Sequence, residues 1–307
     1  MPFGQPVTRE ANGLSAESWV SGKTCMITGS NSGIGKTTAL ALARVGAKVV
    51  MVCRDATKGE SARLDIISRS GAKGEDVTLM LADLSSLDSV RQLAADFLKR
   101  DQRLHVLVNN AGLILGDRRV TKDGLETTFV VNYLSHFLLT NLLLGAIRSS
   151  APSRIINVSS EAHTAGHIDF EDLQAEKNYG AMRAYSQSKL AQILFTHELA
   201  RRLSGTGVTV NSLHPGVVAT NWGRHSVGAM SAGIRLISPF MASPEKGAET
   251  SIYLASSPDV AAVTGKYFEK KQETASSPES NDDAEAQRLW RVSLALVGLP
   301  DDQSPAP

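Results

Sequence analysis

A tyrosine and a lysine stand four residues apart in the segment AYSQSKLAQILFTHELARRL, whose pattern predicts a helix. On a helix this spacing puts Tyr185 and Lys189 on one face, one turn apart. A free phenol has a pKa of about 10, and a neighbouring ammonium lowers it by favouring the phenolate. The pair could therefore move a proton to or from an alcohol oxygen. Isolated pairs of this kind are usually surface or snorkelling residues, so the surroundings decide their meaning.

A serine pair, Ser159 and Ser160, ends the apolar run IINVSS. If this run is a strand of a parallel sheet, both serines lie at its carboxyl end, the edge where ligands bind. A hydroxyl there could bind the same oxygen as the phenol. The alternative is that one of these serines only caps a helix.

A glycine-rich loop follows the first apolar run in TGSNSGIGKTTALALA. Gly29, Gly33 and Gly35 fall between an expected strand and an expected helix. Glycine permits the turn and lets the backbone approach a pyrophosphate, which the N–H groups of a helix N-terminus then bind. A purely structural turn is the alternative. A nucleoside-triphosphate loop is excluded, because Ser30 stands where that motif needs its first glycine.

The second apolar run ends at Cys53 and is followed by Arg54 and Asp55. These positions meet the adenosine ribose in a nucleotide-binding sheet, where an acid favours a free 2′-hydroxyl and an arginine a 2′-phosphate. Guanidinium geometry suits phosphate, so NADP(H) is favoured over NAD(H), unless Arg54 is an ordinary surface charge. Asp83 and Asn110 follow the third and fourth runs, as turn residues or as neighbours of the cofactor.

The elements that would position these residues alternate along the chain. Strands are predicted at Thr24–Thr28, Lys48–Cys53, Val77–Leu81, Val106–Asn109, Arg154–Val158, Val208–Leu213 and Lys266–Phe268. Helices are predicted at Gly35–Val45, Lys58–Arg69, Ser86–Arg100, Gly124–Ser149, Ala181–Ser204, Pro244–Ala255 and Asp283–Leu296. Runs rich in Val and Ile suit strands buried on both faces. We therefore expect an α/β domain, a doubly wound parallel sheet of about seven strands with helices on both faces.

Composition excludes several classes of protein. The chain has 307 residues, with 32 Lys and Arg against 31 Asp and Glu, a net charge of +1. This balance argues against nucleic-acid binding, which needs a basic surface. Cys25 and Cys53 lie in apolar runs and are expected to be buried and reduced, and the histidines show no metal-ligand spacing, so no metal is expected. No signal peptide is expected. A membrane span is not expected either, since the longest apolar stretch, 133–147, is too short and too polar to cross a bilayer. We therefore predict a cytoplasmic protein.

Several motifs together make the chain similar to a known family. TGSNSGIG, NNAG at Asn109–Gly112, the serine pair, YSQSK and HPG at His214–Gly216 resemble, in order, the single-domain short-chain dehydrogenases/reductases. CRDATKGE, DLSS, NVSSEAH and HPGVVATN resemble the retinol dehydrogenase-like branch, over roughly Lys23 to Leu299. Membrane-bound members of that branch carry an N-terminal anchor, whereas this chain begins with a polar segment.

The resemblance implies a Rossmann-type fold and a role for each matching residue. Tyr185 would be the general acid/base, Lys189 would lower its pKa and hold the nicotinamide ribose, Ser160 would bind the substrate oxygen, and Asn132 would complete a proton relay. The cofactor would be held by Gly29, Ser32, Gly33, Ile34 and Gly35 at the pyrophosphate, Arg54 at the 2′-phosphate, Asp83 and Leu84 at the adenine, Asn110, Ala111 and Gly112 at the adenosine side, and Pro215, Gly216, Val218 and Thr220 at the nicotinamide.

The domain is expected over residues 19–300, between flexible tails at 1–18 and 301–307. A substrate lid is expected near 217–245, where apolar side chains would suit an apolar carbonyl compound or alcohol unless they form core or a dimer contact. The helices that carry Asn132 and Tyr185 form a homodimer or homotetramer interface in many relatives. Here that interface would use Leu138, Leu142, Leu190, Ile193 and Leu194, unless these residues face the chain's own sheet.

The predicted activity is hydride transfer between NADP(H) and an apolar or aromatic carbonyl or alcohol. A non-catalytic nucleotide-sensing or scaffold protein on the same fold is one alternative, and the complete set of catalytic residues counts against it. A light-driven reductase similar to protochlorophyllide reductase is another alternative. It shares several motifs, but no cysteine lies near the predicted pocket.

Overall fold

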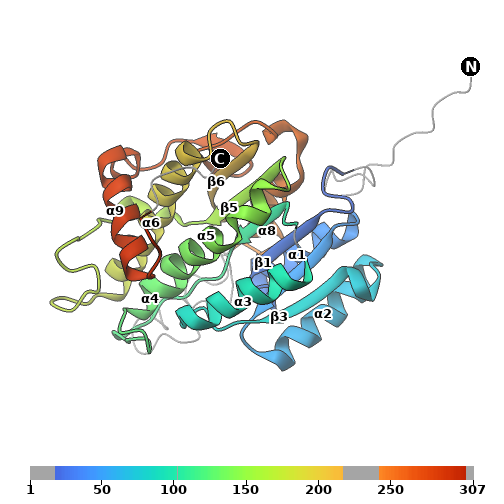
Figure 1. Cartoon of the computed structure of the whole chain (residues 1–307), viewed down its shortest axis with the longest axis horizontal. Coiled ribbons are helices and arrows are strands. Elements are labelled where there is room, and N and C mark those ends of the chain that lie inside the picture. Colours follow the sequence, from blue (N-terminus) through green and yellow to red (C-terminus); the bar gives the residue numbers. More distant parts are fainter. Residues whose placement is uncertain (1–17, 102, 217–241, 302–307) are drawn as a thin grey trace, which may run out of the picture.

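The computed structural model describes residues 18–101, 103–216 and 242–301, and these residues share one central sheet (Figure 1). Its eight strands lie in the order β3-β2-β1-β4-β5-β6-β7-β8. The strands are β1 Thr24–Thr28, β2 Lys48–Cys53, β3 Val77–Leu81, β4 Val106–Asn109, β5 Ser153–Val158, β6 Val208–His214, β7 Lys266–Glu269 and β8 Gln272–Thr274. All neighbours pair in parallel except β7 and β8. The predicted parallel α/β fold is confirmed.

The eighth strand is an addition to the seven expected. β8 is exposed along all three of its residues and pairs antiparallel with β7. Lys270 and Lys271 connect the two strands with φ of 49° and 66°. Two consecutive positive φ angles form the tight turn that matches the twist of a hairpin. A short polar strand after two lysines has no apolar run to reveal it.

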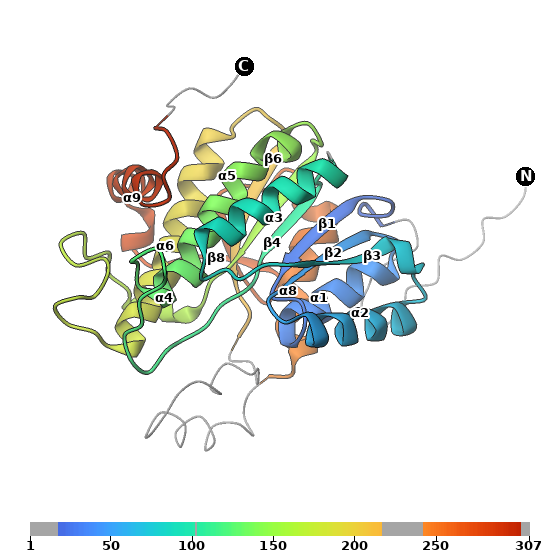
Figure 2. The same ribbon diagram turned by 60° about the horizontal axis from the view of Figure 1, so that its bottom comes forward.

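Helices cover both faces of the sheet. They are α1 Gly33–Arg44, α2 Ala56–Ser70, α3 Leu87–Arg100, α4 Thr127–Phe129, α5 Ser135–Arg148, α6 Ala181–Arg202, α8 Pro244–Ser256 and α9 Asp283–Leu296. Short turns are η1 Gly74–Asp76, η2 Val130–Leu134, η3 Glu161–Ala165, η6 Pro258–Val260 and η7 Glu279–Asn281. One buried core lies under α1, α2 and α8 and another under α3, α5, α6 and α9 (Figure 2). Cys25 and Cys53 are buried and unpaired.

The helix α9 packs along the outer side of α6. Its Trp290 ring lies 5.0 Å from Phe137 and 5.9 Å from Phe195, centroid to centroid. Leu138, Leu190 and Leu194, predicted as dimer contacts, belong to this chain's own core. These three residues are therefore packed inside the chain, as the alternative to a dimer contact predicted.

One stretch among the described residues, Thr127–Arg148, is long and apolar enough to cross a membrane. The expectation that this region is too short and too polar is therefore wrong on length and composition. The structure shows why the stretch is apolar, since 78% of its apolar window is buried inside the fold. It forms α4, η2 and α5, which lie against the sheet and α3.

Candidate active site

The predicted site residues gather at the carboxyl ends of the central strands. The glycine loop follows β1, Asn110–Gly112 follow β4, and Ser159 and Ser160 follow β5. These three strands are neighbours in the sheet, so their ends meet at one edge. Carboxyl ends at the point where the strand order reverses are where open α/β sheets bind ligands.

The α6 helix brings Tyr185 and Lys189 to this edge. Both side chains are buried, and the Lys189 Nζ lies 5.6 Å from the centroid of the Tyr185 ring. The Nζ donates hydrogen bonds to the Val158 carbonyl at 2.8 Å and to Gln192 Oε1 at 3.0 Å. Burial lowers the pKa of Lys189 to about 7, because desolvation disfavours the ammonium. In the free protein this lysine therefore titrates near neutral pH.

Asn132 lies in the π-helical turn η2 and is fully buried. Its Oδ1 accepts from the Leu113 N–H at 2.8 Å, and its Nδ2 donates to the Leu113 carbonyl at 2.9 Å. The same Nδ2 donates to Ser188 Oγ at 2.9 Å, and Ser188 Oγ donates to the Tyr185 carbonyl at 2.7 Å. The asparagine therefore links the segment after β4 to the turn of α6 that carries the tyrosine.

Gly112 shows how closely these groups converge. A Cβ at this position would lie 3.4 Å from Asn132 Oδ1 and 3.6 Å from Lys189 Nζ. The segment after β4, the π-helical turn and α6 thus meet at one point. Three of the predicted site residues are brought together there, as their spacing along the chain alone could not show.

Ser160 stands at the start of η3, two residues after Val158, whose carbonyl accepts from Lys189 Nζ. Its Oγ accepts from the Ala162 N–H at 3.2 Å, so the serine caps η3, as the alternative interpretation proposed. A cap uses only an acceptor lone pair, and the O–H proton has no acceptor among the described residues. η3 packs on α6 so closely that a Cβ on Gly166 would lie 2.6 Å from the Ser186 carbonyl. Ser160 and Tyr185 therefore lie on adjoining elements.

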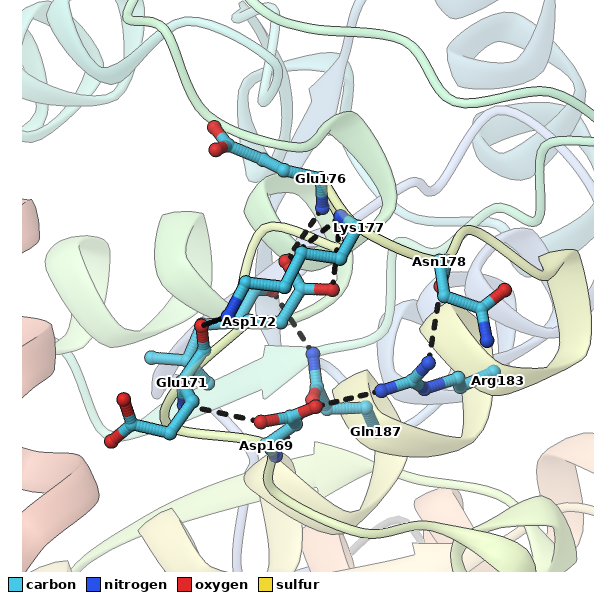
Figure 3. Close-up of polar contacts among 9 residues, drawn as sticks. Asp169, Glu171, Asp172, Glu176, Lys177, Asn178, Arg183 and Gln187 are labelled. Carbon is cyan, nitrogen blue, oxygen red and sulfur yellow. Dashed lines mark hydrogen bonds and ion pairs between the residues drawn. The ribbon is translucent and has the colours of Figure 1, made fainter.

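The segment between η3 and α6 fastens the helix on both sides of Tyr185 (Figure 3). Arg183 Nη2 donates to Asp169 Oδ2 at 2.7 Å. Gln187 is buried, its Oε1 accepts from the Asp169 N–H at 3.1 Å, and its Nε2 donates to the Leu173 carbonyl at 3.1 Å. Sequence reasoning missed both residues, although Gln187 lies inside the YSQSK motif.

The glycine loop forms a cradle that fits a dinucleotide. Gly29 and Gly33 have φ of +68° and +54°, a region that favours glycine. A Cβ on Gly35 would lie 2.5 Å from both the Gly29 carbonyl oxygen and Asn110 Nδ2. Ser32 precedes α1 and makes no side-chain capping bond, so the first N–H groups of the helix and this hydroxyl can receive a phosphate. The pyrophosphate of a dinucleotide such as NAD(H) or NADP(H) fits these residues.

The residues predicted around the adenosine differ in what they do. Asp55 accepts from the Lys58 N–H at 2.9 Å and caps α2, while Arg54 is exposed and makes no ion pair among the described residues. Asp83 accepts from the N–H and hydroxyl of Ser85, which makes it a turn residue. Asn110 Nδ2 donates to the Thr28 carbonyl at 2.8 Å. The side chains of Asp83 and Asn110 thus already form hydrogen bonds within the fold.

Leu84 is buried beside this turn, and Pro215 and Gly216 follow β6 at the same edge, Gly216 with φ of +82°. Val218, Thr220 and most of the expected lid lie outside the described residues, as do most of the two expected tails. Pro244 and Glu245, at the end of the expected lid, begin α8.

Comparison with known proteins identifies the chain's relatives. The family model described as short chain dehydrogenase matches residues 23–229. Human retinol dehydrogenase 13 is 48% identical over 286 residues, covering 91% of this chain and 86% of that protein. Mouse retinol dehydrogenase 14 is 47% identical, with 97% and 92% covered. Bovine retinol dehydrogenase 12 is also 47% identical, with 91% and 87% covered.

Solved structures with the same fold also match this chain. An uncharacterised protein from Mycobacterium paratuberculosis is 34% identical, with a TM-score of 0.73 and coverage of 91% of this chain and 94% of that chain. A blue fluorescent protein from a metagenomic library, in complex with NADPH, is 28% identical with a TM-score of 0.64, covering 81% and 96%.

Proposed function

This chain belongs to the short-chain dehydrogenase family, among the relatives of retinol dehydrogenases 11 to 14, and from this premise we propose a specific activity. In this proposal the protein transfers hydride between NADP(H) and the alcohol or aldehyde carbon of an apolar, retinoid-type substrate. That the chain is an NAD(P)-dependent oxidoreductase of CH–OH groups follows from the family. The names of its relatives support the substrate class.

The residues of the candidate tetrad, Asn132, Ser160, Tyr185 and Lys189, divide the work of the chain. Bound NADP(H) supplies or accepts the hydride. Tyr185 gives a proton to the substrate oxygen in reduction and takes it back in oxidation. The Ser160 hydroxyl donates to the same oxygen and polarises it. In its charged form Lys189 favours the phenolate, and Asn132 fixes the turn of α6 that carries the tyrosine.

The proposal is carried by one set of contacts. Asn132 is bonded on one side to Leu113 and on the other to Ser188, which is bonded to the Tyr185 carbonyl. The Lys189 Nζ lies 5.6 Å from the centroid of the Tyr185 ring. Such a connected, buried polar network beside a nucleotide cradle rigidifies a catalytic geometry.

The test is the loss of NADPH absorbance with retinaldehyde, followed for the wild type and for Tyr185→Phe. We expect the substitution to lower kcat by about 100-fold or more, because the proton donor is removed. Tyr253→Phe is the matched control, a half-buried tyrosine on α8 that packs against the core under α1, α2 and α8. Equal rates for the wild type and Tyr185→Phe would refute the assigned role.

We also propose that NADP(H) is preferred over NAD(H). Asp55 caps α2 with its carboxylate and Arg54 is exposed beside it, so the guanidinium is the group available to a 2′-phosphate. Arg54→Ala should raise the KM for NADPH at least about 10-fold and leave the KM for NADH almost unchanged. Lys48→Ala, which removes an exposed charge at the other end of β2, is the control. A parallel rise in both KM values would contradict the proposal.

A further inference from the structure

Two buried histidines lie against the main chain of the candidate tetrad. His136, on α5, and His163, on η3, are each only 1% exposed. The Nδ1 of His136 lies 3.1 Å from the Asn132 carbonyl oxygen, and the Nδ1 of His163 lies 2.7 Å from the Ser160 carbonyl oxygen. Each ring therefore contacts one residue that the proposed function requires.

The hydrogen-bond partner of the second ring nitrogen settles the tautomer of His163. Its Nε2 lies 3.1 Å from the backbone N–H of Ser277. A backbone N–H can only donate, so Nε2 carries a lone pair and the ring proton is on Nδ1. His163 therefore donates from Nδ1 to the Ser160 carbonyl. The ring spans from the end of β5 to the segment after β8, which is distant in sequence.

The same logic applies to His136 through Thr28. Thr28 Oγ1 accepts from the N–H groups of Asn110 at 2.9 Å and Ala111 at 3.0 Å, which uses both of its lone pairs. Its proton is left to donate, and His136 Nε2 lies 3.0 Å away, nearer than the Val108 carbonyl at 3.4 Å. His136 therefore also carries its proton on Nδ1 and donates it to the Asn132 carbonyl.

We infer that His136 and His163 are positioning residues of the reaction, which tie the backbones of Asn132 and Ser160 to the frame of the nucleotide site and to the C-terminal part of the sheet. The inference rests on the proposed function. A carbonyl held by a rigid ring fixes the backbone dihedral angles beside it, and these set the direction of the catalytic side chain. Burial supports the neutral state, because it lowers the pKa of His136 to about 3 and lowers that of His163.

The chain offers a way to separate the two bonds of each ring. Asparagine places an amide N–H near the position of Nδ1, whereas the longer glutamine reaches the position of Nε2. His163→Asn should therefore keep the bond to Ser160, and His163→Gln should keep the bond to Ser277. We expect the glutamine variant to lose about 10-fold or more in kcat with little change in the KM for NADPH, and the asparagine variant to retain most of kcat. His136→Asn and His136→Gln should differ in the same sense.

His197→Gln is the matched control. This histidine also contacts a backbone carbonyl, that of Ser280 at 2.8 Å, and its contacts lie outside the tetrad. Its substitution should shift the unfolding midpoint and leave kcat unchanged. If the asparagine and glutamine variants at His163 lose kcat equally while the wild type is active, the inference fails and the proposed function stands. An inactive wild type would instead refute the proposed function.

A spectroscopic readout needs neither activity nor a variant. Long-range ¹⁵N–¹H correlation spectra of the ring nitrogens distinguish the tautomers of neutral histidine. The inference requires the Nδ1–H form for both His136 and His163 at neutral pH. An Nε2–H form, or a doubly protonated ring, at either position would overturn it for that residue.

Discussion

The buried ammonium of Lys189 makes a prediction about stability that can be worked through in numbers. Burial lowers its pKa from an ordinary 10.5 to about 7. Each pH unit of such a difference corresponds to about 1.4 kcal/mol, so carrying the charge inside the folded free protein costs about 5 kcal/mol. Below about pH 7 both the folded and the unfolded chain hold the proton, and this cost is present in full.

The sign follows from proton counting. Between about pH 7 and about pH 10 the unfolded chain binds the Lys189 proton and the folded chain does not, so stability rises with pH over this window. Lys189→Met removes the titration, although it also leaves the Val158 carbonyl and Gln192 Oε1 without their donor. That second loss does not depend on pH and shifts the two curves by a constant amount, about 1–3 kcal/mol per acceptor.

The assay is urea unfolding of the cofactor-free wild type and of Lys189→Met across this pH window. The stability of the wild type relative to the variant should rise by about 1.4 kcal/mol per pH unit, or about 3 kcal/mol over most of the window. Titrating groups that do not interact with Lys189 are common to both proteins and cancel in the difference. Parallel curves would show that Lys189 is not charged at a cost in the folded free protein, and would refute the reasoning.

Further predictions concern the glycine loop, the exposed side of α5 and the packing of α9 on α6. Gly35→Ala should destabilise the fold by about 1–3 kcal/mol and weaken NADPH binding measured by fluorescence titration, because its Cβ meets Asn110 at 2.5 Å. Gly145→Ala, at an exposed point of α5 with no atom within 4 Å of the new Cβ, should instead stabilise by about 0.5–1 kcal/mol. Trp290→Ala should cost about 3–5 kcal/mol in denaturant unfolding, and a cost below about 1 kcal/mol would contradict the packing of α9 on α6.

The order of strands and helices was predictable because most of the sheet is buried on both faces. β1, β4 and β5 are buried at every position, and the sequence shows an apolar run at the centre of each, although β5 also buries Arg154 and Asn157. β8 was not predictable, because tight hairpin turns are usually recognised by glycine or asparagine, and this turn has Lys270 and Lys271 instead. The π-helical turn at Val130–Leu134 was also missed, because its residues continue an apolar helical pattern without a break.

The candidate site was predictable only where residue type alone limits the chemistry. A tyrosine and a lysine one turn apart, or glycines between a strand and a helix, restrict what a position can do. Gln187 and His163 carry no such restriction, because their roles come from the partners Leu173 and Ser277 that folding brings to them. Single polar residues of this kind gain their meaning from tertiary contacts that no spacing rule encodes.

The position of α9 has a consequence for how the molecule is made. Tyr133, beside Asn132, shares a hydrogen bond of 2.7 Å with Ser293 of α9, and Arg202 at the end of α6 lies over the Trp290 ring. During synthesis on a ribosome, the helix that bears Tyr185 thus stays uncovered until residues 283–296 have emerged. A fragment that stops before Asp283 lacks Trp290 and would expose Phe137 and Phe195. Chaperones and proteases could then recognise the chain as incomplete.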